Sequence, residues 1–111
     1  EAPVRTFASR ALLMRGYTVL EAENAEVALD ILTDSDLKID VFVTDVIMPG
    51  LDGPTWVKQA LESRPDTRVV FVSGYAEESL AENQMRVPNS VFLPKPFSLN
   101  QLTNVVHNQM Q

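Results

Sequence analysis

The sequence predicts an α/β fold built on a parallel sheet with helices on both faces. Short apolar runs rich in Val and Phe recur at residues 18–21, 41–44, 68–72 and 90–93. They show little polar alternation, as is typical of strands that are buried on both faces of a sheet. Segments with helical apolar spacing separate these runs, and each is long enough to connect two parallel strands.

Each of the first three helical segments carries a start signal, a stop signal or both. Apolar residues at helical spacing end shortly before Gly16, which is a plausible helix stop. Asn24 is placed to cap the second helix. The third opens at Gly53 and Pro54 and closes before Pro65.

Two further helices complete the pattern. Residues 76–85 form a weaker fourth segment, and Ser98 is placed to cap a fifth.

The first helical pattern starts at the beginning of the sequence, whereas a doubly wound unit normally begins with a strand. We therefore expect a strand to precede Glu1, so that residues 1–111 form one domain that is incomplete at its N-terminus.

The composition excludes several classes of function. The 111 residues suit one domain, and nine basic against fifteen acidic residues give a net charge of −6. This acidity argues against binding to nucleic acid or anionic membranes. The sequence has no cysteine, which excludes disulfides, thiolate metal sites and cysteine nucleophiles. The apolar runs are only strand-length, and we expect a soluble, cytoplasmic domain, with tethering to a membrane-bound kinase as an option.

Three polar residues follow successive predicted strands. Asp45, Ser73 and Lys95 come at or just after the ends of the runs at 41–44, 68–72 and 90–93. In a parallel sheet these ends meet at one edge, where ligands bind. A carboxylate, a hydroxyl and an ammonium group at one edge suggest phosphoryl transfer to the carboxylate, with Asp45 as nucleophile and the other two groups contacting phosphoryl oxygens.

Simpler interpretations compete for each residue. Asp45 is a poor candidate for a helix cap, because the residues after it do not start a helix. Lys95 could be an ordinary solvated lysine, but flanking prolines fix the direction of its backbone. Ser73 before Gly74 fits a turn equally well.

The proposed chemistry also calls for a cation. A carboxylate and a phosphoryl group repel each other, so a divalent ion, most plausibly Mg²⁺, must offset the charge. Mg²⁺ takes oxygen ligands and usually only a few from protein. Asp45 supplies one, and a second acidic ligand is missing from the given residues.

Three blocks of the sequence resemble a known family. Residues 41–53 (VFVTDVIMPGLDG), 72–75 (VSGY) and 93–97 (LPKPF) look like the signature blocks of response-regulator receiver domains. The resemblance implies a flavodoxin-like (CheY-like) fold with sheet order 2-1-3-4-5, of which the first strand is missing here. It also implies a Mg²⁺-dependent phosphoaspartate.

Carried over by position, the resemblance assigns roles to individual residues. Asp45 would be the phospho-acceptor, Ser73 the switch hydroxyl and Lys95 the lysine of the site. Phe92 falls at the position of the switch aromatic, although a buried strand aromatic is often plain core. The backbone carbonyl of Ile47 falls at a metal ligand.

The same resemblance implies features around these residues. The Lys95–Pro96 peptide bond is expected to be cis, and an acidic pair that helps to bind Mg²⁺ is expected upstream of Glu1. Residues 48–54 (MPGLDGP) and 73–77 (SGYAE) look most like the C-terminal receiver of a CckA-type hybrid histidine kinase. The implied partners are a histidine kinase domain, a histidine phosphotransferase protein, or both.

Alternatives at the level of function remain. A degenerate receiver would bind proteins without phosphorylation, and the missing acidic pair favours it. A phosphatase with an aspartate nucleophile is a poor fit, because Asp45 does not begin an Asp-x-Asp pair. A nucleotide-binding protein is rejected, because the sequence has four glycines and no phosphate-binding loop.

Three other residues invite attention. Asp52 is a rival acceptor, but Asp-Gly in a loop is usually a turn. His107 is interpreted as surface rather than as a phosphorelay histidine. Trp56 could serve packing or contact a partner.

Overall fold

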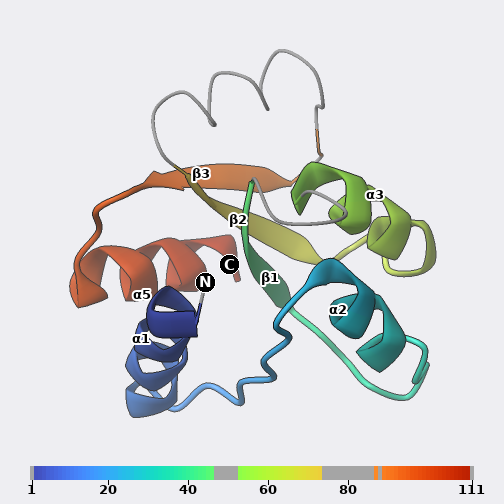
Figure 1. Ribbon diagram of the computed structural model, residues 1–111, viewed down its shortest axis with the longest axis horizontal. Coiled ribbons are helices and arrows are strands. Elements are labelled where there is room, and N and C mark those ends of the chain that lie inside the picture. The colour runs from blue at the N-terminus through green and yellow to red at the C-terminus, as the bar shows by residue number, and fades with distance from the viewer. Residues whose placement is uncertain (1, 47–52, 74–86, 88, 111) are drawn as a thin grey trace.

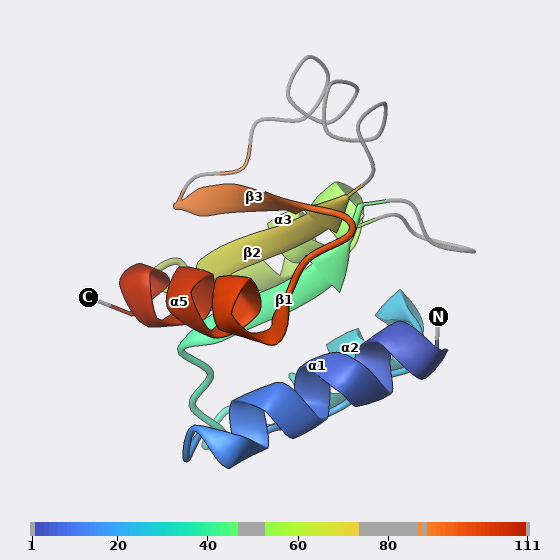
Figure 2. The ribbon, with the colours of Figure 1, turned by 90° about the vertical axis from the view of Figure 1, so that its left-hand side faces the viewer.

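The computed structural model describes residues 2–46, 53–73, 87 and 89–110. Within these residues, a three-stranded parallel sheet lies between two pairs of helices (Figure 1). Helices α1 and α5 cover one face of the sheet, and α2 and α3 cover the other; Figure 2 shows α5 in front of the sheet and α3 behind it. The predicted α/β architecture with helices on both faces is confirmed.

The strands coincide with three of the four apolar runs. They are β1 (Val41–Asp45), β2 (Arg68–Ser73) and β3 (Ser90–Pro94), and each extends its predicted run by one residue. All pair in parallel, in the order β1-β2-β3, which agrees with the 3-4-5 part of the predicted sheet order. The central strand β2 is buried on both faces, which explains its unbroken apolar sequence.

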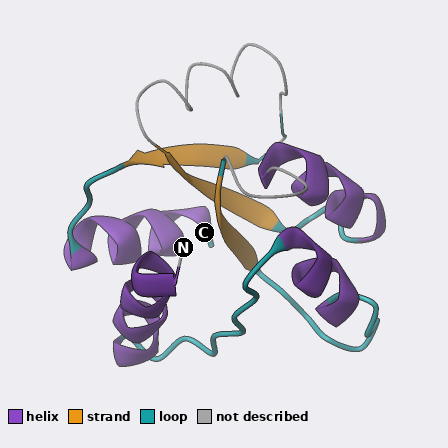
Figure 3. Cartoon of the chain, in the orientation of Figure 1, coloured by secondary structure: helices purple, strands orange, loops and turns teal. Residues whose placement is uncertain are grey.

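The predicted strand at residues 18–21 is wrong. These residues belong to no strand and to no ladder with β1 (Figure 3). A β-strand is defined by backbone hydrogen bonds to a neighbour, and the predicted order placed another strand between these residues and β1. No such strand is present in the described parts of the chain, so the β-branched sequence alone does not produce one.

The expected start and stop signals lie at the ends of the observed helices. They are α1 (Ala2–Met14), α2 (Ala25–Ile31), α3 (Gly53–Ser63) and α5 (Leu99–Gln109). Gly16 follows α1 with a φ of 90°, a left-handed conformation that favours glycine. The Asn24 side chain accepts from the backbone N–H of Val27 and caps α2. The predicted helix at residues 76–85 lies outside the described residues.

Ser98 begins α5 with a capping box. Its hydroxyl accepts from the Gln101 backbone N–H at 3.1 Å, and the Gln101 side chain accepts from the Ser98 backbone N–H at 2.7 Å. Two backbone donors at the start of the helix are thereby satisfied. The predicted cap at Ser98 is confirmed.

Two apolar cores lie on opposite faces of the sheet. The core under α2 and α3 includes Phe42, Trp56 and Phe71, and the core under α1 and α5 includes Val70 and Leu102. Alternate residues of β1 serve the two faces, because successive side chains of a strand point in opposite directions. No helix in the described parts of the chain is both long and apolar enough to cross a membrane.

Candidate functional site

The strand register brings the predicted site residues to one edge of the sheet. Asp45, the last residue of β1, pairs with Val72, and Ser73, the last residue of β2, pairs with Pro94. Lys95 follows directly after β3. The carboxyl ends of the strands are where open parallel sheets bind ligands. The placement therefore agrees with the expected position of a site.

Asp45 and Lys95 form an ion pair at this edge. Lys95 Nζ lies 2.9 Å from Asp45 Oδ1, and that oxygen is itself shielded from solvent. The side chains as wholes remain partly exposed, at 20% for Asp45 and 34% for Lys95. The pair is thus only partly screened by water, and part of the Asp45 side chain is exposed at the edge of the sheet. The Lys95–Pro96 peptide bond is cis, as expected.

The backbone of Asp45 is held by a hydrogen-bonded contact with α3. Thr44 Oγ1 donates to the Asp45 carbonyl oxygen at 3.0 Å and accepts from the Trp56 indole Nε1 at 3.2 Å. Trp56 also packs against Phe42, with ring centroids 5.1 Å apart. Of the two interpretations of Trp56, packing is therefore the one that the structure supports.

Gly53 brings the start of α3 close to the end of β1. Its backbone N–H donates to the Val46 carbonyl at 2.8 Å, and a Cβ at this position would lie 2.1 Å from the Asp45 carbonyl oxygen. Only glycine allows the start of α3 to come this close to the end of β1. Sequence reasoning assigned no such role to Thr44 or Gly53; the available signal was a glycine at the start of an amphipathic helix.

Phe92 lies in β3, opposite Phe71 in β2. The two rings stack with centroids 5.4 Å apart, and Phe92 is half-buried against the core under α2 and α3. This position suits both a core residue and a residue that moves, so its switch role stays a prediction. Ile47 and Asp52 lie outside the described residues, as does the side chain of Ser73.

Asp45 can supply one oxygen ligand to a metal ion. Among the described residues, no group of three or more acidic or histidine side chains forms a metal cluster. Mg²⁺ is often held by one or two carboxylates together with phosphate oxygens and water. The Asp45 carboxylate fits that chemistry, whereas the Ile47 carbonyl and the expected upstream acidic pair stay predictions.

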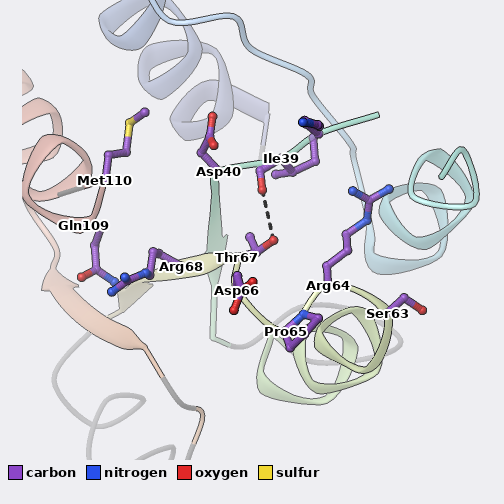
Figure 4. Close-up of a pocket in the computed structure, with 11 residues that line it drawn as sticks. Ile39, Asp40, Ser63, Arg64, Pro65, Asp66, Thr67, Arg68, Gln109 and Met110 are labelled. Carbon is purple, nitrogen blue, oxygen red and sulfur yellow. Dashed lines mark hydrogen bonds between the residues drawn. The ribbon is translucent and has the colours of Figure 1, made fainter. Parts of the chain in front are cut away.

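Other features lie at the opposite edge of the sheet. An open pocket of about 630 Å³ is found at the amino ends of β1 and β2, where Thr67 donates to the Ile39 carbonyl (Figure 4). Gln109, at the end of α5, donates to the Val69 and Asn89 carbonyls at this same edge. His107 is exposed in the last turn of α5, away from Asp45.

Comparison with known proteins identifies the family. The model of the response regulator receiver domain matches residues 1–107, so the chain belongs to this family. Receiver domains are the signalling domains of two-component systems. They are phosphorylated on an aspartate and generally bind Mg²⁺ at the phosphorylation site.

Two receiver-containing proteins of Brucella abortus are similar to this chain. The chain is 43% identical over all 111 residues to the sensor kinase CckA of Brucella abortus, and it spans 12% of that protein's length. It is 29% identical over 107 residues to the response regulator receiver protein CpdR of the same organism, matching 96% of this chain and 88% of CpdR.

Solved structures agree. The crystal structure of the receiver domain from the hybrid histidine kinase CckA matches with a TM-score of 0.84 and 40% identity, covering 100% of this chain and 93% of that one. A response regulator receiver protein from Sinorhizobium medicae matches with a TM-score of 0.85 and 31% identity, covering 99% and 87%. The CheY-like receiver fold is therefore confirmed.

Proposed function

We propose that this chain accepts a phosphoryl group on Asp45 and passes on a two-component signal. The observation that carries this proposal is the Asp45–Lys95 ion pair at the carboxyl edge of the sheet, with a partly exposed carboxylate. The donor would be a phosphohistidine on a histidine kinase or on a histidine phosphotransferase protein. The similarity to the CckA receiver favours a place within a hybrid histidine kinase, on the cytoplasmic side of the membrane.

The chemistry follows from the charges at this edge. A carboxylate oxygen of Asp45 attacks phosphorus, an O–P bond forms, and the N–P bond to the donor imidazole breaks. The imidazole leaves with the bonding electron pair and takes up a proton. Lys95 neutralises negative charge beside the transferred group. Such transfers depend mainly on positioning and charge neutralisation.

Three further roles belong to the proposal. Mg²⁺, held by Asp45, the Ile47 carbonyl and the expected upstream acidic pair, would neutralise charge on the phosphoryl oxygens. Ser73 would contact a phosphoryl oxygen. Phe92, stacked on Phe71, would move when Ser73 moves toward the phosphoryl group, and this movement would alter the nearby surface.

Intact mass after incubation with acetyl phosphate and Mg²⁺ tests the proposal. Here the O–P bond of acetyl phosphate breaks and acetate leaves. The unaltered chain, in its natural sequence context, should gain the mass of one phosphoryl group, and Asp45→Asn should gain none. Asp40→Asn is the matched control and should gain one phosphoryl group. Asp40 is an exposed aspartate that directly precedes the first residue of β1.

The remaining outcomes decide against the proposal. If Asp45→Asn still gains a phosphoryl group, Asp45 is not the acceptor. If neither the unaltered chain nor the variants gain one, a receiver that binds proteins without phosphorylation becomes the better account.

A further inference from the structure

Two buried side chains connect α3 to the backbone of Asp45. Trp56 Nε1 lies 3.2 Å from Thr44 Oγ1, which lies 3.0 Å from the Asp45 carbonyl oxygen. An indole N–H can only donate and a carbonyl can only accept, so the direction of both hydrogen bonds is fixed. Trp56 is 5% exposed and Thr44 8%, so water cannot readily replace either partner.

The same carbonyl is also held from a second side. The close approach of Gly53 leaves no room for the Asp45 carbonyl to move toward α3, and the Gly53 backbone N–H fixes the next carbonyl, that of Val46. The Asp45 side chain leaves the backbone at this restrained peptide. Its direction toward Lys95 therefore depends on the peptide that Thr44 holds.

We propose that Thr44 and Trp56 are positioning residues for phosphoryl transfer to Asp45, acting through the backbone carbonyl of the acceptor. This inference rests on the proposed function and assigns it two residues outside the Asp45–Lys95 ion pair. An attacking oxygen displaced by about 1 Å can lose about a hundredfold in rate. The Thr44 hydroxyl is suited to prevent such a displacement, because it is buried, donates to the Asp45 carbonyl and accepts from the Trp56 indole.

Thr44 offers a nearly isosteric test. Thr44→Val keeps the shape and removes the hydroxyl, which leaves the Trp56 indole N–H without its acceptor, whereas Thr44→Ser keeps the hydroxyl. Thr67→Val is the matched control, because Thr67 is also buried and donates at 3.0 Å to a carbonyl, but at the opposite edge of the sheet (Figure 4). Phosphoryl uptake from acetyl phosphate, followed by intact mass, should slow at least tenfold in Thr44→Val, within the range expected for a misplaced nucleophile. Thr44→Ser and Thr67→Val should stay close to the unaltered rate.

Trp56 supplies an independent readout, because it is the only tryptophan of the chain. Its fluorescence should change when Mg²⁺ and beryllofluoride, a phosphoryl mimic, are added to the unaltered chain and to Thr44→Ser. The change should shrink or vanish in Thr44→Val, since the hydroxyl that links the indole to the acceptor is gone. Circular dichroism establishes that each variant is folded. Trp56→Phe, which keeps an aromatic ring without the N–H, should slow phosphoryl uptake, as Thr44→Val does.

The outcomes separate this inference from the proposed function. An unaltered chain that takes no phosphoryl group would overturn the proposed function and this inference with it. Normal uptake by Thr44→Val, or equal slowing by Thr67→Val, would overturn the positioning role alone.

Discussion

Replacing Gly53 with alanine sets two physical effects against each other. Gly53 is the first residue of α3 and its φ is not positive, so its backbone accepts alanine. Helix propensity and the entropy of the unfolded chain would then favour alanine by about 0.5–1 kcal/mol. The new Cβ, however, would lie 2.1 Å from the Asp45 carbonyl oxygen, about 1.3 Å short of the 3.4 Å at which ordinary van der Waals contact begins.

The steric clash with the Asp45 carbonyl should outweigh the gain in helix propensity and unfolded-state entropy. The obstructing atom belongs to the backbone of β1 and cannot swing away as a side chain could. Overpacking against a rigid neighbour costs about 1–3 kcal/mol, and we expect the upper half of that range. At about 4–8 °C per kcal/mol for a domain near 100 residues, the melting temperature should fall by about 10 °C or more. Because the carbonyl that must move is that of Asp45, the proposed acceptor, phosphoryl uptake should slow by about tenfold to a hundredfold.

Thermal unfolding followed by circular dichroism and phosphoryl uptake followed by mass measure the two effects. Gly16→Ala is the matched control. Gly16 has a φ of 90° and open space around its Cβ position, so alanine there is strained but touches nothing. It should lose about 1 kcal/mol of stability and keep its rate of phosphoryl uptake. A Gly53→Ala protein that is as stable as the unaltered chain and equally fast would refute the reasoning.

Three other substitutions probe separate contacts. Arg64 donates to three backbone carbonyls in the segment after α2, so Arg64→Lys, which cannot reach all three, should lower the free energy of unfolding in urea by about 1.5–3 kcal/mol. The same exchange at exposed Arg10 should change it by less than about 0.5 kcal/mol, and equal losses at both positions would contradict this role. Ser98→Ala removes half of the capping box of α5 and should cost about 1 kcal/mol in the same assay, whereas Ser98→Thr should keep most of it. Lys95→Gln should change stability by less than about 1 kcal/mol, because the ion pair is partly exposed. It should nevertheless slow phosphoryl uptake by about a hundredfold, and an unchanged rate would remove Lys95 from the site.

The sequence predicted features that depend on local chemistry. Asn24 and Ser98 cap helices because their side chains reach backbone donors three residues away. The strands at β1, β2 and β3 were predicted because apolar runs suited to burial on both faces are conspicuous. The common edge of Asp45 and Lys95 follows from the parallel direction of those strands.

Features that depend on the detailed packing of distant segments were not predicted. Residues 18–21 have the composition of a strand, yet a strand also requires a neighbour to pair with. The Trp56–Thr44 hydrogen bond depends on how α3 is rotated against β1, and helical periodicity does not fix that rotation to within one hydrogen bond. The three carbonyls that Arg64 binds are likewise about 30 residues away in sequence.

Asp45 is the proposed carrier of the phosphoryl group. The most direct test is to treat the phosphorylated protein with borohydride, which reduces an aspartyl phosphate to homoserine, and to locate the altered residue by peptide mass spectrometry. The structure predicts homoserine at position 45, beside Lys95. Homoserine at Asp52 or at any other aspartate, with residue 45 unchanged, would contradict it.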